Sequence, residues 1–208
     1  MAERRQTSVM TEYKDGMKIV TTTTIVTTRA DAPDRDEALE KRAAVLDRNN
    51  IADPSPAPPK EDFQKKALER HNHYRSKHGV PPLEWCSKCA AKAQAHADHM
   101  AQTNNFSHST EKGFGENLFN SSSSRGPDIN ADKAVDSWYN EISEMKFGQP
   151  APSNFSQVGH FTQVVWKETT HVGMAYAVKG NSVFVVANYL PPGNFVGKFH
   201  ENVFPPKN

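Results

Sequence analysis

Apolar residues recur at helical spacing in several segments after residue 60. Residues 62–78 carry one such stripe, which Gly79 ends before two prolines. Residues 87–103 repeat small side chains on one face, a pattern that lets a neighbouring element approach closely. A third apolar stripe covers residues 130–146, and a fourth, shorter helix is predicted around residues 160–167.

The last third of the chain has the alternating pattern of strands. Every second position is apolar in the run Val172, Met174, Tyr176 and Val178. The dipeptide Gly180-Asn181 is typical of a two-residue hairpin turn, and residues 182–190 return as an apolar strand. Residues 115–119 predict a further short strand. Helices combined with a mostly antiparallel sheet indicate an α+β fold.

Residues 1–60 follow a different pattern and are predicted to be an N-terminal extension. They contain a β-branched segment, a short exposed helix and a proline-rich linker, at residues 8–28, 34–48 and 53–59. Asp15-Gly16 in the first segment is a hairpin dipeptide. Because the extension has a single aromatic residue, it offers little apolar surface to offset the entropy of ordering. We expect a poorly structured extension followed by one domain over residues 61–208.

Charge and hydropathy exclude several classes of protein. The 208 residues carry 25 basic and 24 acidic side chains, so the strong positive excess of a nucleic-acid-binding protein is missing. The longest apolar runs are strand-sized, far below the roughly 20 residues that span a bilayer. The first residues contain no apolar segment typical of a secretory signal, which favours the cytosol.

Cys86 and Cys89 are the two cysteines of the chain, and they form a C-x-x-C motif just before a predicted helix. This spacing occurs in redox pairs and in halves of zinc sites. A second C-x-x-C motif is missing, and no βαβ pattern is visible around the first. Two ordinary reduced thiols are therefore the favoured interpretation, with a redox or metal role as the alternative.

Local catalytic signatures such as G-x-S-x-G, H-E-x-x-H or a phosphate-binding loop are missing from the sequence. Four other motifs occur in order: HNHYR at residues 71–75, GENL at 115–118, GHFTQVVW at 159–166 and FVVANYLPPGN at 184–194. Together they resemble the signature motifs of the CAP superfamily of cysteine-rich secretory, antigen and pathogenesis-related proteins. The match runs from about residue 62 to the end and is closest to the Golgi-associated plant pathogenesis-related branch.

The resemblance implies a three-layer α-β-α sandwich with a cleft lined by two histidines and two acidic residues. The matching positions here are His108, Glu116, Glu141 and His160. Two neutral imidazoles can bind Zn²⁺ while the carboxylates orient them or hold a water, so zinc is a cofactor that the cleft could take without requiring it. Taken singly, each of these side chains is better explained as a hydrogen-bonded residue at the edge of the core, but the four together favour a site. His71, on an apolar stripe, is interpreted as a packing histidine, and Trp138 and Trp166 as core residues.

The sequence also departs from the family. Ala187 stands where secreted relatives have a disulfide cysteine, which fits a reducing compartment. The lipidated Golgi-associated relatives begin with Met-Gly, whereas Ala2 cannot accept a myristoyl group. The expected location is the cytoplasm or the cytosolic face of the Golgi membrane, with an extracellular location, as in most of the family, as the alternative.

The favoured function is a non-catalytic module that binds a lipid, a sterol or a membrane surface. In the family, the loop before the GHF motif is linked to sterol binding, and here that loop carries Phe147, Pro150, Pro152 and Phe155. Ordinary packing of this loop is the plain alternative. Two rival functions are a zinc-assisted hydrolase, with Glu116 or Glu141 as general base, and a protein-interaction module that uses the threonine-rich segment. A homodimer is left open as a partner, and nucleic acid is not expected.

Overall fold

The computed structural model describes residues 4–14, 17–27 and 60–207. The chain forms two compact units, Met1–Lys60 and Glu61–Asn208. The helix predicted at residues 34–48 and the proline-rich segment after it lie outside the described residues.

The first unit contains an antiparallel hairpin. Strands β1 (Arg4–Lys14) and β2 (Met17–Thr27) pair with Lys14 opposite Met17 and Arg4 opposite Thr27. This agrees with the hairpin that the β-branched segment predicts. The Asp15-Gly16 turn itself lies outside the described residues.

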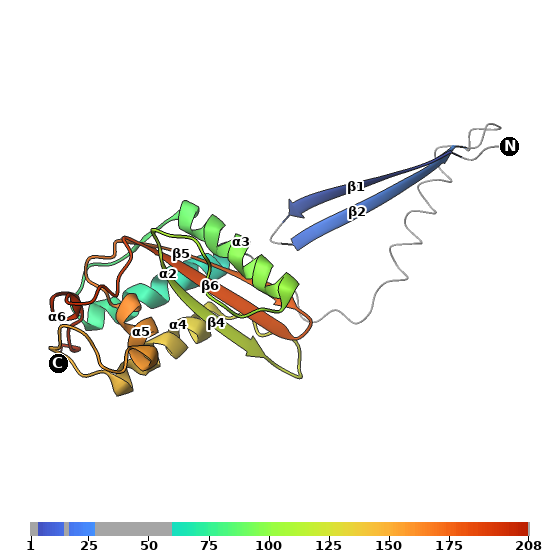
Figure 1. Ribbon diagram of the computed structural model, residues 1–208. Helices are drawn as coiled ribbons and strands as arrows, with labels where there is room; N and C mark the ends of the chain where they lie inside the picture. The colour runs from blue at the N-terminus through green and yellow to red at the C-terminus, as the bar shows by residue number, and fades with distance from the viewer. Residues whose placement is uncertain (1–3, 15–16, 28–59, 208) are drawn as a thin grey trace. The chain divides into compact units, whose positions relative to one another are not determined.

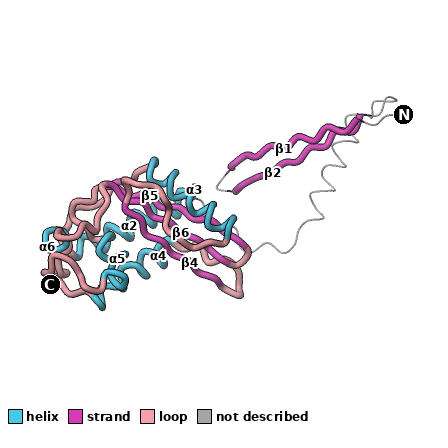
Figure 2. Tube along the Cα trace, in the orientation of Figure 1, coloured by secondary structure: helices cyan, strands magenta, loops and turns pink. Residues whose placement is uncertain are grey.

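The second unit is built on a four-stranded sheet with the order β3-β5-β6-β4. Figure 2 shows its three long strands, β5, β6 and β4. Its strands are β3 (Glu84–Trp85), β4 (Gly115–Ser122), β5 (His171–Lys179) and β6 (Ser182–Leu190). The short strand β3 runs parallel to β5, and the other neighbours pair antiparallel. Lys179 lies opposite Ser182, and Gly180 has a φ of 57°, the left-handed conformation that the predicted two-residue turn needs.

Both faces of the two central strands, β5 and β6, are buried, and their side chains alternate between two hydrophobic clusters. On β5, Met174 and Tyr176 enter one cluster, and Ala175 and Ala177 enter the other. Helix α3 (Ser87–Thr103) covers the alanine side with its small-residue face. On the opposite face lie three helices: α2 (Lys60–Lys77), α4 (Ala131–Tyr139) and α5 (Phe155–Val164) (Figure 1). The predicted α+β fold and α-β-α sandwich are confirmed.

The boundaries of two predicted helices were wrong. The helix predicted at 130–146 is α-helical only to Tyr139 and continues as a 3-10 turn, η2 (Asn140–Glu144). The helix predicted at 160–167 begins earlier, at Phe155, and ends at Val164. Gly159 lies inside this helix although glycine is a poor helix former. A larger residue there would be crowded, since an added Cβ would lie 3.1 Å from the Phe155 ring.

The interpretation of the cysteines as reduced thiols was also wrong, since Cys86 and Cys89 form a disulfide. Cys86 is the N-cap of α3 in extended conformation, and Cys89 lies in the first helical turn. This geometry brings the two Cα atoms to 5.2 Å, within the range that a disulfide bridges.

Arg75 on α2 joins three segments of the second unit, although its side chain is fully buried. Its guanidinium donates to the carbonyl oxygens of Pro81, Val164, Trp166 and Thr169 at 2.8 to 3.0 Å. Burial lowers the pKa of Arg75 to about 10, which leaves the group charged at neutral pH. A single guanidinium group therefore donates hydrogen bonds to backbone carbonyl oxygens in the turn after α2, at the end of α5 and in the turn before β5.

A second buried network leads from α2 across the sheet. The Nδ1 atom of His71 lies 2.7 Å from the Ala67 carbonyl oxygen, so it carries the proton, and Nε2 accepts from the Tyr189 hydroxyl at 2.8 Å. The same hydroxyl accepts from the Asn117 amide, which also donates to the carbonyl oxygen of His160. Burial lowers the pKa of His71 to about 4, so the ring is neutral, in agreement with its predicted packing role.

Replacing Arg75 should destabilise the domain strongly. Arg75→Met keeps most of the volume but removes all four bonds, and in the described part of the chain only the Trp166 oxygen keeps another donor, the backbone N–H of Thr169. The loss should reduce the free energy of unfolding by about 3–5 kcal/mol. Urea unfolding measures the loss. Lys92→Met, which breaks an exposed ion pair with Glu111, is the control and should cost less than about 1 kcal/mol. Equal losses in the two variants would contradict the role given to Arg75.

His71 should make the domain sensitive to acid. Its folded pKa of about 4 lies below the unfolded value of 6.5, so the unfolded chain binds more protons between these values and stability falls as the pH drops through this window. The contribution amounts to about 3 kcal/mol. Urea unfolding of His71→Gln at pH 7 and pH 4.5 should show a smaller difference than the native chain. His73→Gln, at an exposed position on the same helix, should keep the native difference.

Candidate functional site

The first candidate pair joins the segment before β4 to the start of that strand. Nδ1 of His108 lies 2.8 Å from Oε1 of Glu116, which also accepts from the backbone N–H of Ser109 at 2.9 Å. The Glu116 side chain is 10% exposed, whereas that of His108 is 65% exposed. The hydrogen bond with Glu116 raises the pKa of His108. Burial acts to raise the pKa of Glu116, but the bonds from His108 and Ser109 outweigh it and leave that pKa lowered.

The second pair joins η2 to α5. Oε1 of Glu141 lies 2.6 Å from Nδ1 of His160, and Oε2 accepts from the backbone N–H groups of His160 and Phe161 at 2.9 and 3.1 Å. The His160 ring also stacks against Trp138 with 6.4 Å between ring centroids. Three hydrogen bonds to one carboxylate therefore fix the imidazole on the helix.

The structure places the four predicted residues as two His–Glu pairs. Asn117 links them, because it follows Glu116 on β4 and donates to the carbonyl oxygen of His160 at 3.1 Å. Among the described residues, no group of three or more His, Cys, Asp or Glu side chains is arranged to hold a metal ion. The structure thus shows two oriented pairs rather than a three-ligand cluster.

Each pair leaves one imidazole nitrogen available. A carboxylate at Nδ1 holds the proton on that atom of a neutral ring, so that Nε2 presents its lone pair. In addition, Oε2 of Glu116 is buried without a hydrogen-bond partner in the described structure. Imidazole nitrogens and carboxylate oxygens are atom types that bind divalent cations, but the described side chains form two pairs and not one group of three ligands.

A groove of about 500 Å³ opens beside His108 and extends the site along α3. Two further histidines line it, His96 and His99, whose rings lie 6.3 Å apart, and Nε2 of His96 contacts the Ser107 carbonyl oxygen at 2.8 Å. Sequence reasoning missed both residues. Their i, i+3 spacing on the polar face of α3 was the available signal.

The four residues predicted to bind lipid have different surroundings. Phe147 packs edge-on against Phe161, and the Pro150 carbonyl oxygen accepts from the backbone N–H of Gly197 at 2.9 Å. Pro152 and Phe155 instead line a small cavity of about 70 Å³, together with Ala151, Asn194, Val196 and Phe199. Two of the four therefore face this cavity, while Phe147 belongs to the packing around the core.

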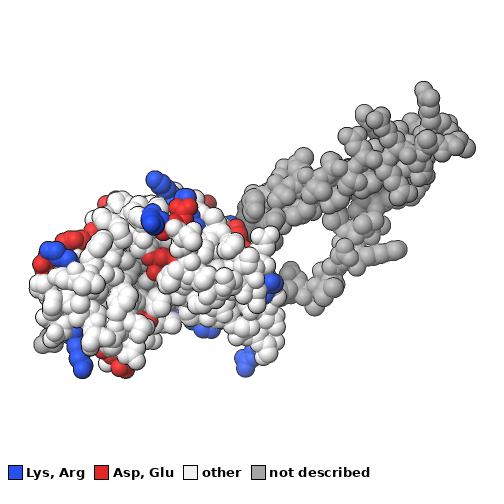
Figure 3. Space-filling view, in the orientation of Figure 1, with Lys and Arg blue, Asp and Glu red and all other residues white. Residues whose placement is uncertain are grey.

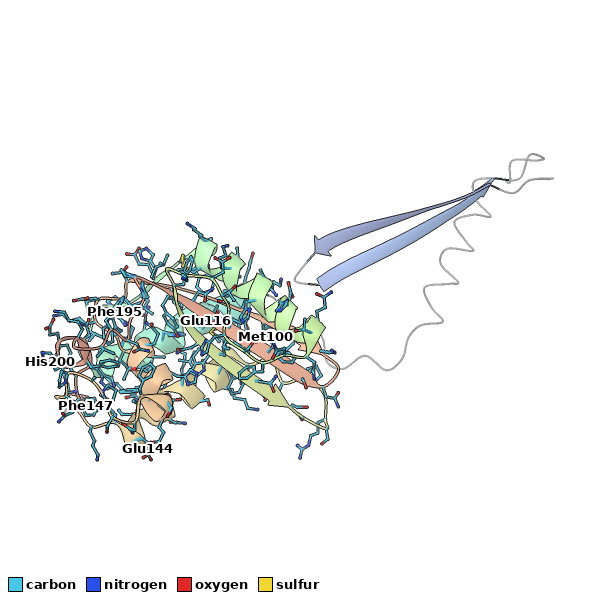
Figure 4. The ribbon with its side chains drawn as sticks, viewed as in Figure 1. Met100, Glu116, Glu144, Phe147, Phe195 and His200 are labelled. Carbon is cyan, nitrogen blue, oxygen red and sulfur yellow. A yellow bond between two sulfur atoms is a disulfide. The ribbon has the colours of Figure 1, made fainter. Side chains whose placement is uncertain are left out.

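Sequence reasoning also missed two exposed apolar residues, Phe195 and Val196, which follow the last motif. They are 53% and 85% exposed, and Phe155 is 47% exposed. We call these three residues and the cavity beside them the apolar end, which lies next to α6 (Phe199–Asn202). Figure 4 labels Phe147 and Phe195 toward the end with α6, whereas Glu116 is labelled near the middle of the domain.

Known proteins share this sequence and this fold. The Cysteine-rich secretory protein family, CAP, matches residues 68–189. The human Golgi-associated plant pathogenesis-related protein 1 is 42% identical over 151 residues, covering 70% of this chain and 94% of the relative. A probable pathogenesis-related protein of Arthroderma benhamiae is 37% identical over 161 residues, and the match covers 70% of this chain but 50% of that longer protein.

Among solved structures, one titled "Crystal structure of NaASP2 with Zn2+" superposes with a TM-score of 0.60 at 30% identity, covering 71% of this chain and 87% of that chain. The structure of BmVAL-1 has the same TM-score of 0.60 at 20% identity and covers 76% of this chain and 88% of that chain, which supports the fold alone. The ordered motifs, the α-β-α sandwich and these matches lead to one conclusion: the chain belongs to the Cysteine-rich secretory protein family, the CAP family.

Proposed function

We propose that the CAP domain is a non-catalytic binding module that attaches to a lipid surface through its apolar end. The supporting observation is the exposure of Phe155 and Val196, which line one small cavity, and of Phe195, which directly precedes Val196 in the chain. Exposed apolar side chains that cluster in this way mark membrane or protein contacts rather than ordinary surface. Each of them would gain free energy on leaving water.

The size of the cavity favours a lipid surface over an enclosed sterol. Pockets that enclose a ligand of drug size have volumes of roughly 300 Å³ or more. The cavity at the apolar end has about 70 Å³, which is enough for the end of an alkyl chain. The exposed side chains around it would enter the lipid, while the cavity would take part of one acyl chain.

Charge contributes little to the proposed attachment. Lys198, close to the apolar end in sequence, is paired with Glu201 at 2.9 Å. The face of the domain seen in Figure 3 mixes basic and acidic side chains without a patch of one sign. Binding should therefore depend on apolar contact and tolerate neutral lipids and salt.

The location that fits this function is the cytosolic face of the Golgi membrane, with the domain attached peripherally. The human relative is Golgi-associated by its name. Within residues 60–207 and the N-terminal hairpin, no helix is long and apolar enough to cross a membrane. Attachment through surface side chains needs no such helix.

The His–Glu pairs are proposed to take a divalent metal ion as an ancillary feature, since a similar CAP structure carries Zn²⁺ in its title. Nε2 of His108 and of His160 would hold the ion, and the unpartnered Oε2 of Glu116 would hold a water bound to it. A bound Zn²⁺ supplies Lewis acidity and lowers the pKa of its water. Glu141 keeps the His160 ring in place through its three hydrogen bonds.

Polar substitution at the apolar end should weaken lipid attachment. The full chain with Phe195→Ser and Val196→Ser should bind phosphatidylcholine vesicles at least about tenfold more weakly, because each side chain contributes on the order of 1 kcal/mol of transfer free energy. Co-sedimentation measures the bound fraction. Phe106→Ser, at a position 49% exposed outside the apolar end, is the matched control and should bind like the native chain.

Equal binding of the native chain and the double variant would refute lipid attachment through the apolar end. Vesicles with and without sterol should bind the native chain equally. Binding that appeared only with sterol would assign the module to sterol recognition instead.

Zinc should stabilise the domain through the His–Glu pairs. A ligand at 100 times its dissociation constant stabilises a folded protein by about 2.7 kcal/mol, which should raise the melting temperature by several degrees. Both His108→Ala and His160→Ala should abolish the rise, and Glu141→Gln should reduce it. His99→Ala, in the neighbouring groove, is the control and should keep it.

The zinc variants also separate the proposed module from a hydrolase. Vesicle binding should survive His160→Ala, because the apolar end carries it. Zinc-dependent turnover of an ester or peptide that disappeared in both histidine variants would replace the non-catalytic function by a hydrolase.

A further inference from the structure

The disulfide at the start of α3 joins two sulfur atoms in different environments. Cys89 has 0% exposure, whereas Cys86 is half-buried at the N-cap and flanked by the exposed residues Ser87 and Lys88. A thiol that approaches from solvent therefore reaches the Cys86 side of the bond. Such an asymmetric C-x-x-C pair has one sulfur that exchanges and one that resolves.

The turn that carries the pair is held by the backbone and not by the disulfide alone. The backbone N–H of Cys86 donates to the Val172 carbonyl oxygen at 2.9 Å, and the Ala90 N–H donates to the Cys86 carbonyl oxygen at 2.9 Å. The turn also lies directly on β5 at Gly173, where an added Cβ would come within 2.1 Å of the Ala90 nitrogen. Opening the sulfur–sulfur bond would therefore leave the cysteines side by side.

The helix start also favours a thiolate at Cys86. The backbone N–H of Cys89 donates to Sγ of Cys86 at 3.0 Å, and this bond remains available to a free thiolate. The positive end of the α3 dipole acts in the same direction. After reduction, Cys86 has a stabilised anionic form close to the surface, while Cys89 is shielded beneath it.

We propose that Cys86 and Cys89 form a reversible thiol–disulfide exchange site for dithiols, with Cys86 as the exchanging sulfur and Cys89 as the resolving sulfur. The site uses neither the His–Glu pairs nor the apolar end, so it stands independently of the proposed lipid function.

The proposed exchange is balanced in atoms and electrons. One thiolate of the dithiol attacks Sγ of Cys86, a mixed disulfide forms there, and the Cys86–Cys89 bond breaks as Cys89 leaves and takes a proton. The second thiol of the dithiol then attacks the mixed disulfide, forms the cyclic or intrachain disulfide of the reagent and releases Cys86 as a thiol. Two electrons pass from the dithiol to the protein disulfide, and the reverse sequence restores it.

The two sulfur atoms can be tested separately, because the chain has two cysteines and each single substitution leaves one thiol. Full-length Cys89→Ser keeps Cys86 and should react with 5,5′-dithiobis(2-nitrobenzoate) at least tenfold faster than full-length Cys86→Ser in native buffer. In about 8 M urea, which unfolds most domains, the reaction rates of the two variants should converge, because neither sulfur atom is buried any longer. Equal native rates, or a faster Cys86→Ser, would overturn the assignment.

The native chain supplies a measurement that does not depend on either variant folding. Dithiothreitol should reduce the disulfide in native buffer, with the circular dichroism spectrum unchanged, and glutathione disulfide should restore it, as alkylation and mass spectrometry report. Reduction that occurred only in denaturant would refute a surface exchange site.

Discussion

The buried guanidinium of Arg75 is the constraint on which the second unit depends most. Arg75 donates from α2 to three carbonyl oxygens at the end of α5 and in the turn before β5. One of them, on Trp166, also accepts from the backbone N–H of Thr169. A charged, planar donor group supplies enough N–H bonds for the task, and backbone dipoles rather than a carboxylate compensate its charge. The position of α5, and therefore of His160, follows from this contact.

His71 lies one helical turn before Arg75 on the same face of α2, and it also acts on α5. Its bond to Tyr189 leads through Asn117 to the backbone of His160. One face of α2 thus holds both the end of α5 and its middle, through one charged and one neutral side chain. Both networks are buried, so removing Arg75 or His71 would leave buried polar groups without hydrogen-bond partners. These two polar side chains therefore stabilise a core that is otherwise predominantly apolar.

The candidate functions occupy separate parts of one rigid scaffold. The His–Glu pairs lie where β4, η2 and α5 meet, the apolar end lies in the loops next to α6, and the disulfide lies at the start of α3. The two pairs also differ from one another. Glu141 uses both oxygens on His160 and its helix, whereas Glu116 keeps one buried oxygen without a partner. The His108–Glu116 pair is therefore the one that has a carboxylate oxygen left to bind a ligand.

The sequence by itself determined the fold class, the β5–β6 hairpin and its turn, and the positions of the two histidines and two glutamates. Alternation of apolar residues and four ordered motifs are local signals, so they can be read without coordinates. The true start of α5 was missed, because residues 147–155 have the proline and glycine content of a loop and Gly159, a poor helix former, lies inside the helix. Tertiary structure alone decided which glutamate orients which histidine, since the partners are 8 and 19 residues apart in the chain. It also decided that Phe147 packs while Phe195 and Val196 are exposed, and that Cys86 and Cys89 form a bond. Burial and side-chain pairing depend on contacts between elements that are distant in the sequence, so the hydrophobicity pattern along the chain does not predict them.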